Sequence, residues 1–170
     1  MNNRKFSSDL IVSISAIVIA IASIIVAVWQ GIENRNHNRL SVRPRLDMSF
    51  SLDYADSLAQ LKIRNNGLGP AVIDEAKAVI ENKDFDINKA DELFNFLSEL
   101  GIHDISVTYQ LLSLGSTIIP NDVKKIFSIK ISNLKKLGLD PNNFIKNVKF
   151  IIKYKSLYEE EFVIEHSYGD

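Results

Sequence analysis

The chain has no cysteine among its 170 residues, and it contains only 4 prolines, 7 glycines and 1 tryptophan. The lack of cysteine excludes disulfide bridges, thiolate zinc sites and cysteine nucleophiles, and it fits a reducing compartment. No H-E-x-x-H motif, Walker loop or G-x-S-x-G motif occurs. Only three histidines are present, and nothing in the sequence brings them together. We therefore expect no metal site, no cofactor and no enzymatic activity.

Charge is distributed unevenly along the chain, although the formal net charge is only −1. Residues 1–45 carry six basic and two acidic residues, a net charge of +4, which leaves 14 basic and 19 acidic residues, a net charge of −5, for residues 46–170. Binding to long nucleic acids draws most of its affinity from neutralised phosphates. The C-terminal part is therefore a poor partner for long DNA or RNA, whereas a small nucleotide in one local pocket remains compatible with this charge.

An uncharged run of 20 residues extends from Leu10 to Trp29. At a rise of about 1.5 Å per residue, a helix of this length spans about 30 Å, the thickness of the hydrocarbon core of a bilayer. The competing interpretation is a cleaved signal peptide, but its apolar core is usually shorter, and no convincing A-x-A cleavage site follows here. We expect residues 1–9 to form a short N-terminal tail and residues 10–29 to form an uncleaved transmembrane helix in the lipid bilayer.

Basic residues are more numerous after this run than before it. Arg4 and Lys5 precede the run, and four arginines follow it: Arg35, Arg39, Arg43 and Arg45. The positive-inside rule then predicts an outside N-terminus and a cytoplasmic C-terminal domain in the bacterial inner membrane. Residues 30–45 are predicted to form a basic juxtamembrane hinge that is helical to about Leu40 and breaks before Pro44. The hinge either contacts anionic lipid headgroups or transmits movement of the domain to the membrane helix.

Small residues recur within the apolar run at spacings of three and four. They are Ser13, Ala16, Ala20, Ser23 and Ala27, which share one face of a helix, here called the seam. Helices in lipid associate through close packing at small residues, so we expect a homo-oligomer that assembles through the seam. The competing interpretation is that alanine and serine are simply common in spanning helices. Two serines are too few to predict a selectivity filter.

Alternating apolar and polar residues dominate the chain after residue 45 and indicate β-strands. We predict seven strands, at residues 46–53, 58–65, 72–81, 105–112, 123–131, 148–154 and 161–166. Residues 87–100 have helical periodicity, with an apolar stripe that includes Phe94. Phe96 lies off this stripe and is free to face a partner or a neighbouring subunit. Residues 133–147 are expected to form a short helix and a loop. The predicted fold is one transmembrane α-helix followed by a mainly-β α+β domain, residues 46–170, which is sandwich-like or a small barrel with an inserted amphipathic helix.

Two stretches carry a resemblance to known proteins. His37-Asn-Arg-Leu-Ser-Val-Arg-Pro44 and the turn Asn65-Asn-Gly-Leu-Gly-Pro-Ala71 resemble a group of largely uncharacterised, small, single-pass bacterial membrane proteins. The Lys153-Tyr-Lys-Ser-Leu-Tyr158 hairpin fits the same pattern, whereas the region 85–103 has no counterpart in it. The resemblance implies an architecture and a bacterial origin more than an activity.

A second resemblance concerns layout alone. The chain is similar in layout to membrane effectors of bacterial antiviral systems, including type III CRISPR and related nucleotide-signalling systems, which join spanning helices to a small cytosolic sensor of a cyclic oligonucleotide. This similarity implies a role in antiviral defence and a cyclic oligonucleotide ligand.

The turn that begins at Asn65 is the most prominent candidate for ligand binding. Its simplest interpretation is a loop in which the glycines adopt positive φ angles. The functional interpretation is an anion-binding loop whose backbone N–H groups hold phosphate. In that case the ligand would contact a set of polar and small residues: Arg64, Asn65, Asn66, Gly67 and Lys124.

Two hypotheses of function follow. The first is a membrane-anchored sensor or effector whose cytosolic domain binds a ligand or a partner protein, and whose oligomerised helices then perturb the membrane. The second is a non-enzymatic anchor or scaffold that recruits a partner protein. Under the second hypothesis any unrelated spanning helix could replace residues 10–29, and under the first it could not.

Overall fold

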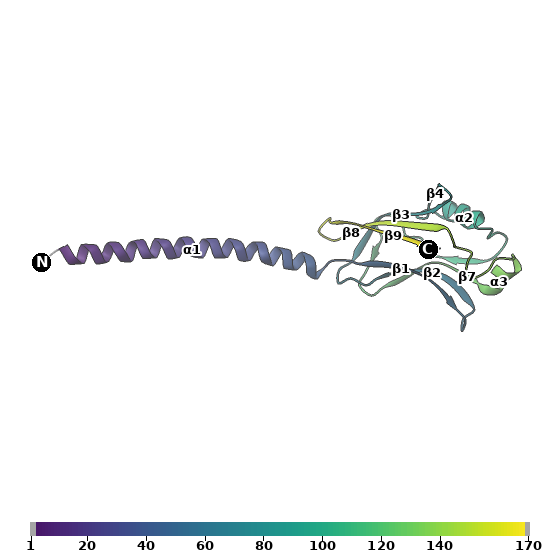
Figure 1. The fold of residues 1–170 in the computed structure, drawn as a ribbon, viewed down its shortest axis with the longest axis horizontal. Helices are drawn as coiled ribbons and strands as arrows, with labels where there is room; N and C mark the ends of the chain where they lie inside the picture. The colour runs from purple at the N-terminus through teal and green to yellow at the C-terminus, as the bar shows by residue number, and fades with distance from the viewer. Residues whose placement is uncertain (1–2, 169–170) are drawn as a thin grey trace. The chain divides into compact units, whose positions relative to one another are not determined.

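A computed structural model describes residues 3–168, with side chains described from Ser8 onward, and it divides the chain into two compact units. The first unit is the single helix α1 (Asn3–Ser41), drawn in purple in Figure 1. Within the described residues it is the one helix long and apolar enough to cross a membrane. The helix begins inside the predicted tail, whose residues 1–2 lie outside the described part. It ends at Ser41, which confirms the predicted helical continuation to about Leu40.

The second unit begins at Val42 and contains two antiparallel sheets, which appear as separate layers in Figure 1. The first sheet has the order β1-β2-β7-β5, and the second has the order β4-β3-β8-β9 with β6 also paired to β3. The strands are β1 (Leu46–Asp53), β2 (Leu58–Asn65), β3 (Ala71–Ile80), β4 (Lys83–Asp86), β5 (Val107–Tyr109), β6 (Thr117–Ile118), β7 (Val123–Lys130), β8 (Val148–Lys155) and β9 (Glu161–Tyr168). We call this unit the β-domain.

One hydrophobic core lies between the two sheets. Alternate residues of β2 and of β8 are fully buried, for example Leu61 and Ile63 on β2 and Phe150 and Ile152 on β8. This alternation follows from the twofold period of a strand, which sends every second side chain to the same face. Edge-to-face aromatic pairs join the layers, and the rings of Phe50 and Tyr168 lie 6.2 Å apart. The two separate sheets exclude a closed barrel.

The described β-domain has nine strands instead of the predicted seven. Strand β4 was missed because its sequence, Lys-Asp-Phe-Asp, has a single apolar residue, and β6 was missed because it has only two residues. The predicted strand 105–112 was too long. Only Val107–Tyr109 pairs with β7, and beyond Gln110, whose N–H donates to the Ile126 carbonyl, the chain leaves the ladder.

Two helices complete the β-domain: α2 (Ala90–Glu99) and α3 (Ile131–Lys136). The expectation that Phe96 is free to face a partner is wrong. Its side chain is fully buried between the rings of Phe85, at 5.9 Å, and Phe150, at 5.8 Å. Phe94 is instead the exposed aromatic, with 47% of its surface accessible. The reason is that the helix starts at Ala90, so its buried face is set by Leu93, Phe96 and Leu97, three and four residues apart.

Candidate functional site: the clamp at the proximal end of the β-domain

The β-domain holds the chain segment Val42–Arg45 against the turn Asn65–Pro70. We call this arrangement the clamp, and the end of the domain where it lies the proximal end. The Asn66 N–H donates to the Arg45 carbonyl at 2.7 Å. The Leu68 and Gly69 N–H groups both donate to the Arg43 carbonyl, at 3.1 and 3.4 Å. The segment that follows α1 is therefore bound by backbone hydrogen bonds before β1 begins.

The two glycines of the turn allow this contact. A Cβ atom on Gly67 would lie 2.3 Å from the Arg45 nitrogen, and one on Gly69 would lie 1.6 Å from the Val42 carbonyl oxygen. Both distances are far below van der Waals contact, so no other residue fits without moving the backbone. The prediction that these glycines adopt positive φ is wrong, because positive φ occurs in the described chain at other glycines and not at these two. Their role is close approach of two backbones.

Asn65 is the centre of the clamp. Its side chain is fully buried, and all of its hydrogen-bonding groups are used. The Oδ1 atom accepts from the Arg45 N–H at 3.2 Å and from the Gly67 N–H at 2.9 Å. The Nδ2 atom donates to the Gly69 carbonyl at 2.8 Å and to the Ile118 carbonyl at 2.9 Å. Because Ile118 belongs to β6, this one amide joins the first sheet to the second.

Two further contacts tie the segment to the second sheet. The Leu46 N–H donates to the Tyr154 hydroxyl oxygen at 3.3 Å, which connects β1 to β8. The guanidinium of Arg43 lies 5.0 Å from the centroid of the Phe162 ring on β9, within the range of a cation–π contact. Pro44, between Arg43 and Arg45 in the sequence, is buried. The clamp therefore engages both layers of the β-domain at once.

The turn does not offer its backbone N–H groups to an anion. The N–H of Asn65 donates to the Asp122 carbonyl at 3.1 Å, and the four that follow donate to Arg45, to the Asn65 side chain and to Arg43, as described above. A phosphate would have to displace these bonds. Asn65 and Gly67 thus have a structural explanation that the anion-binding interpretation did not include.

The structure also separates the two basic residues of the predicted ligand site. Lys124 is the cross-strand partner of Ile63, and Arg64 is the partner of Val123. Cross-strand partners share a face and consecutive residues alternate, so Arg64 and Lys124 lie on opposite faces of the first sheet. Lys124 forms an ion pair with Asp122 at 3.2 Å, whereas Asn66 is exposed. Ligand binding by Arg64, Asn66 and Lys124 stays a prediction, but these residues do not form one cluster.

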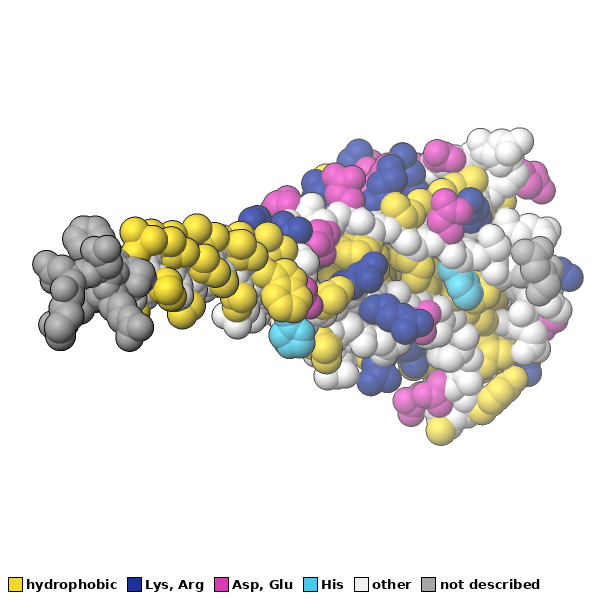
Figure 2. All heavy atoms as spheres, turned by 60° about the vertical axis from the view of Figure 1, so that its left-hand side comes forward, with side chains coloured by type: hydrophobic (Ala, Val, Ile, Leu, Met, Phe, Trp, Pro, Cys, Tyr) yellow, Lys and Arg dark blue, Asp and Glu magenta, His cyan; other side chains and the backbone are white. Residues whose placement is uncertain are grey.

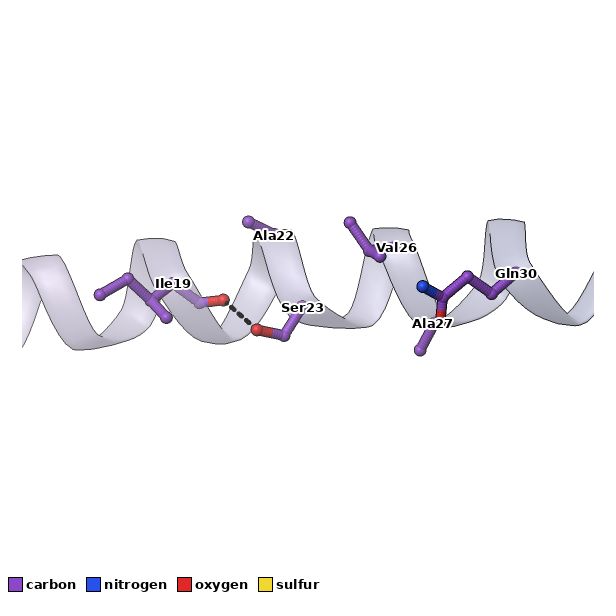
Figure 3. A pocket seen from close by; sticks show the side chains of 6 residues that line it. All are labelled: Ile19, Ala22, Ser23, Val26, Ala27 and Gln30. Atoms are coloured by element: carbon purple, nitrogen blue, oxygen red, sulfur yellow. Dashed lines mark hydrogen bonds between the residues drawn. The ribbon is translucent and has the colours of Figure 1, made fainter.

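The seam residues are all exposed on α1. The Ser13 hydroxyl donates to the Asp9 carbonyl, and the Ser23 hydroxyl donates to the Ile19 carbonyl, both at 2.8 Å. The donors of both serines are therefore satisfied within the helix. Figure 3 shows Ser23 and Ala27 in a shallow depression of the helix surface. The depression is lined by Ile19, Ala22, Ser23, Val26, Ala27 and Gln30.

The four juxtamembrane arginines divide between the two units. Arg35 and Arg39 belong to α1, and Arg43 and Arg45 belong to the clamp. Among the residues whose side chains are described, no group of three or more histidines or acids is placed to hold a metal ion.

Residues 10–168 match a family described as Domain of unknown function (DUF8453). The chain belongs to this family. A comparison with curated proteins gives no match. The family match begins at Leu10, so it covers the apolar run of α1, the clamp and the whole of the described β-domain together.

Sequence reasoning singled out both motifs of the clamp but not their contact. His37–Pro44 and Asn65–Ala71 are separate stretches in the sequence, and the structure brings the end of the first against the second. The roles of Tyr154 and Phe162 were missed altogether. The only signal in the sequence was a pair of glycines next to asparagine and proline, a pattern that fits an ordinary turn equally well.

Proposed function

We propose that this chain is a non-enzymatic, single-pass protein of the bacterial cell membrane. Its β-domain lies in the cytoplasm and responds to a ligand or a partner protein, and its spanning helices self-associate through the seam. The clamp passes changes in the β-domain to those helices. The observation that carries this proposal is the clamp itself. A protein that serves only as a membrane anchor does not need the segment after its helix to be bound by both sheets of its domain.

Flexible linkers let two units move independently, because many linker conformations have similar energy. Here helix α1 ends at Ser41, and the Val42 carbonyl already packs against Gly69. A change in the β-domain that moves Val42 therefore moves the end of the helix. A ligand can use this connection only if it binds the two states of the assembly with different affinity.

Self-association is supported by the small size of the seam residues. Since the hydroxyls of Ser13 and Ser23 donate within the helix, hydrogen bonds between helices are not needed to satisfy them. Close packing at small side chains remains as the source of attraction in lipid. Ser23→Ala should accordingly leave assembly intact, and Ser23→Leu should weaken it.

Cysteine cross-linking in membranes tests the assembly. The chain has no native cysteine, so single cysteines can be placed at each position from Leu10 to Trp29 and oxidised. We expect maxima of dimer formation at positions 13, 16, 20, 23 and 27. A flat profile would overturn self-association through the seam.

A flexible insertion tests whether the β-domain is coupled to helix α1 through the clamp. Six glycine and serine residues between Ser41 and Val42 would leave the apolar run and the clamp unchanged. If the β-domain sets the rotation of the helices, the insertion should flatten the cross-linking profile while membrane insertion stays the same. An unchanged profile would favour the alternative function, a membrane anchor or scaffold that recruits a partner protein.

The antiviral role and the cyclic oligonucleotide ligand are supported by similarity of layout. Equilibrium dialysis of the detergent-solubilised full chain against radiolabelled cyclic oligonucleotides tests them. Arg64→Ala and Lys124→Ala should each weaken binding if these side chains contact the ligand. Wild-type binding by both variants would contradict their assignment.

A further inference from the structure

Strand β9 is a long, unpaired edge of the second sheet. It pairs with β8 over eight residues without a register shift, and among the described strands none lies on its other side. The other edge strands β4, β5 and β6 have four, three and two residues, and only β1 is as long. A long edge presents a row of free N–H and C=O groups that can pair with another chain. Edge strands are commonly protected from such pairing because they are short or carry a β-bulge. Strand β9 has neither feature.

The inward-facing side chains of β9 are only partly covered. Its residues Phe162, Ile164, His166 and Tyr168 are half-buried, whereas their partners Tyr154, Ile152, Phe150 and Val148 on β8 are 0–6% exposed. The difference arises because none of the described strands covers the outer side of these residues. Figure 2 shows hydrophobic side chains left uncovered between charged ones on one face of the β-domain. On the outward face of β9, Val163 is 55% exposed.

Charge along β9 is acidic. Glu161 and Glu165 project from its outward face, with 80% and 54% of their side-chain surfaces exposed. Each has a lysine neighbour on β8: Lys149 lies 2.6 Å from Glu165, and Lys155 lies 4.0 Å from Glu161. Both carboxylates remain accessible from the free side of the strand. A segment with basic residues at alternate positions would therefore match this edge.

Charge favours another protein over a second copy as the occupant of this edge. An antiparallel pair of β9 strands from two copies would bring Glu161 and Glu165 of both copies together. Like charges that lie opposite each other across a strand pair are destabilising, so a second copy matches this edge poorly.

We infer that β9 is a docking edge for an extended segment of a different protein. The segment adds to the second sheet as an antiparallel strand. Its inward side chains are apolar and cover Phe162, Ile164 and Tyr168, and its outward side chains are basic and lie beside Glu161 and Glu165. Backbone hydrogen bonds supply affinity, and the alternating side chains supply specificity.

A designed peptide tests the inference on the full chain in detergent micelles. The probe is a fluorescent eight-residue peptide of alternating lysine and valine, followed by anisotropy and by hydrogen exchange. We expect saturable binding with slower amide exchange confined to Glu161–Tyr168. A peptide of alternating glutamate and valine, and a lysine–valine peptide that is N-methylated along one edge, should not bind.

Two charge-reversal variants, one on β9 and one on α2 as its control, make the test specific to the edge. Glu165→Lys should weaken binding about fivefold, the size expected for one cross-strand charge pair. Glu99→Lys is the matched control, because Glu99 is an exposed glutamate of α2 whose carboxylate is also 2.6 Å from a lysine, Lys83. Equal loss in both variants, no saturable binding, or protection outside β9 would overturn the inference.

A second readout identifies self-pairing. Val163→Cys should give no disulfide-linked dimer in membranes if the occupant is another protein. Efficient cross-linking there would show that a second copy occupies the edge, and would overturn the inference. Neither result depends on the seam, which the cysteine scan of residues 10–29 tests separately.

Discussion

A Cβ atom on Gly69 would lie 1.6 Å from the carbonyl oxygen of Val42. Gly69→Ala should therefore push the segment Val42–Arg45 away from the turn and break the clamp. We expect a loss of at least about 2 kcal/mol in unfolding free energy, because the clashing atoms belong to the backbone and cannot rotate away. Pulse proteolysis of the full chain in detergent and urea measures it. Leu68→Ala, at a neighbouring side chain that is 73% exposed, is the control and should be nearly neutral.

Substitutions that remove or replace the side-chain amide of Asn65 should destabilise the fold. Asn65→Ala leaves the buried Ile118 and Gly69 carbonyls without a donor and should cost about 3 kcal/mol. Asn65→Asp keeps the shape but sets a carboxylate oxygen against those two carbonyls, and should also destabilise the fold. The same urea experiment measures both variants. Wild-type stability of either one would contradict the structural role of Asn65.

Phe96 and Phe94 form a matched pair two residues apart on α2. Phe96→Ala should cost about 3–5 kcal/mol, because it leaves a cavity between Phe85 and Phe150. Phe94→Ala should cost less than about 1 kcal/mol, since it loses mainly an exposed contact with Tyr109. A lower urea midpoint for Phe94→Ala than for Phe96→Ala would contradict the observation that α2 buries Phe96 and exposes Phe94.

Glu75 should make stability depend on pH. Hydrogen bonds from Lys153, at 2.6 Å, and from Lys77 lower the pKa of this carboxyl from its ordinary value of 4.5. A carboxyl with a lowered pKa stabilises the fold above that ordinary value, and the contribution is lost as pH falls through the lowered pKa. The effect should be at most about 1 kcal/mol, because the ion pairs are solvent-accessible.

Urea midpoints at pH 7 and pH 3 check this dependence. Glu75→Gln should show a smaller difference between the two pH values than the wild type. Glu81→Gln, at an exposed turn, is the control and should keep the wild-type difference. A Glu75→Gln difference as large as that of the wild type would show that these ion pairs contribute nothing.

The strands that could be predicted from sequence are those with strict alternation. Residues 46–53 and 58–65 were predicted with the observed bounds of β1 and β2, because each alternates over eight residues and a turn separates them. Strand β6 could not be predicted, since its two residues are a strand only by virtue of pairing with β3. The division into two sheets depends on which strands pair, and periodicity does not report pairing.

The candidate site, the clamp, is also predictable from the sequence only in part. The two motifs of the clamp are visible in the sequence, and so is the break that Pro44 imposes after the helix. Their contact is not visible, because it joins residues 20 to 27 positions apart, mostly through backbone atoms that every residue has. The sequence left both a plain loop and a ligand loop open at Asn65, and its hydrogen bonds to the Gly69 and Ile118 carbonyls show a structural role that neither interpretation included.

The sequence by itself determined the features that depend on local composition. These are the length and apolarity of the run from Leu10 to Trp29, the small residues at seam spacing, and most of the strands. The tertiary structure decided which face of α2 is buried, why Gly67 and Gly69 are glycines, and that β9 is an edge strand among the described strands. The physical reason is that close backbone approach, burial and edge position are properties of residues brought together from distant parts of the chain.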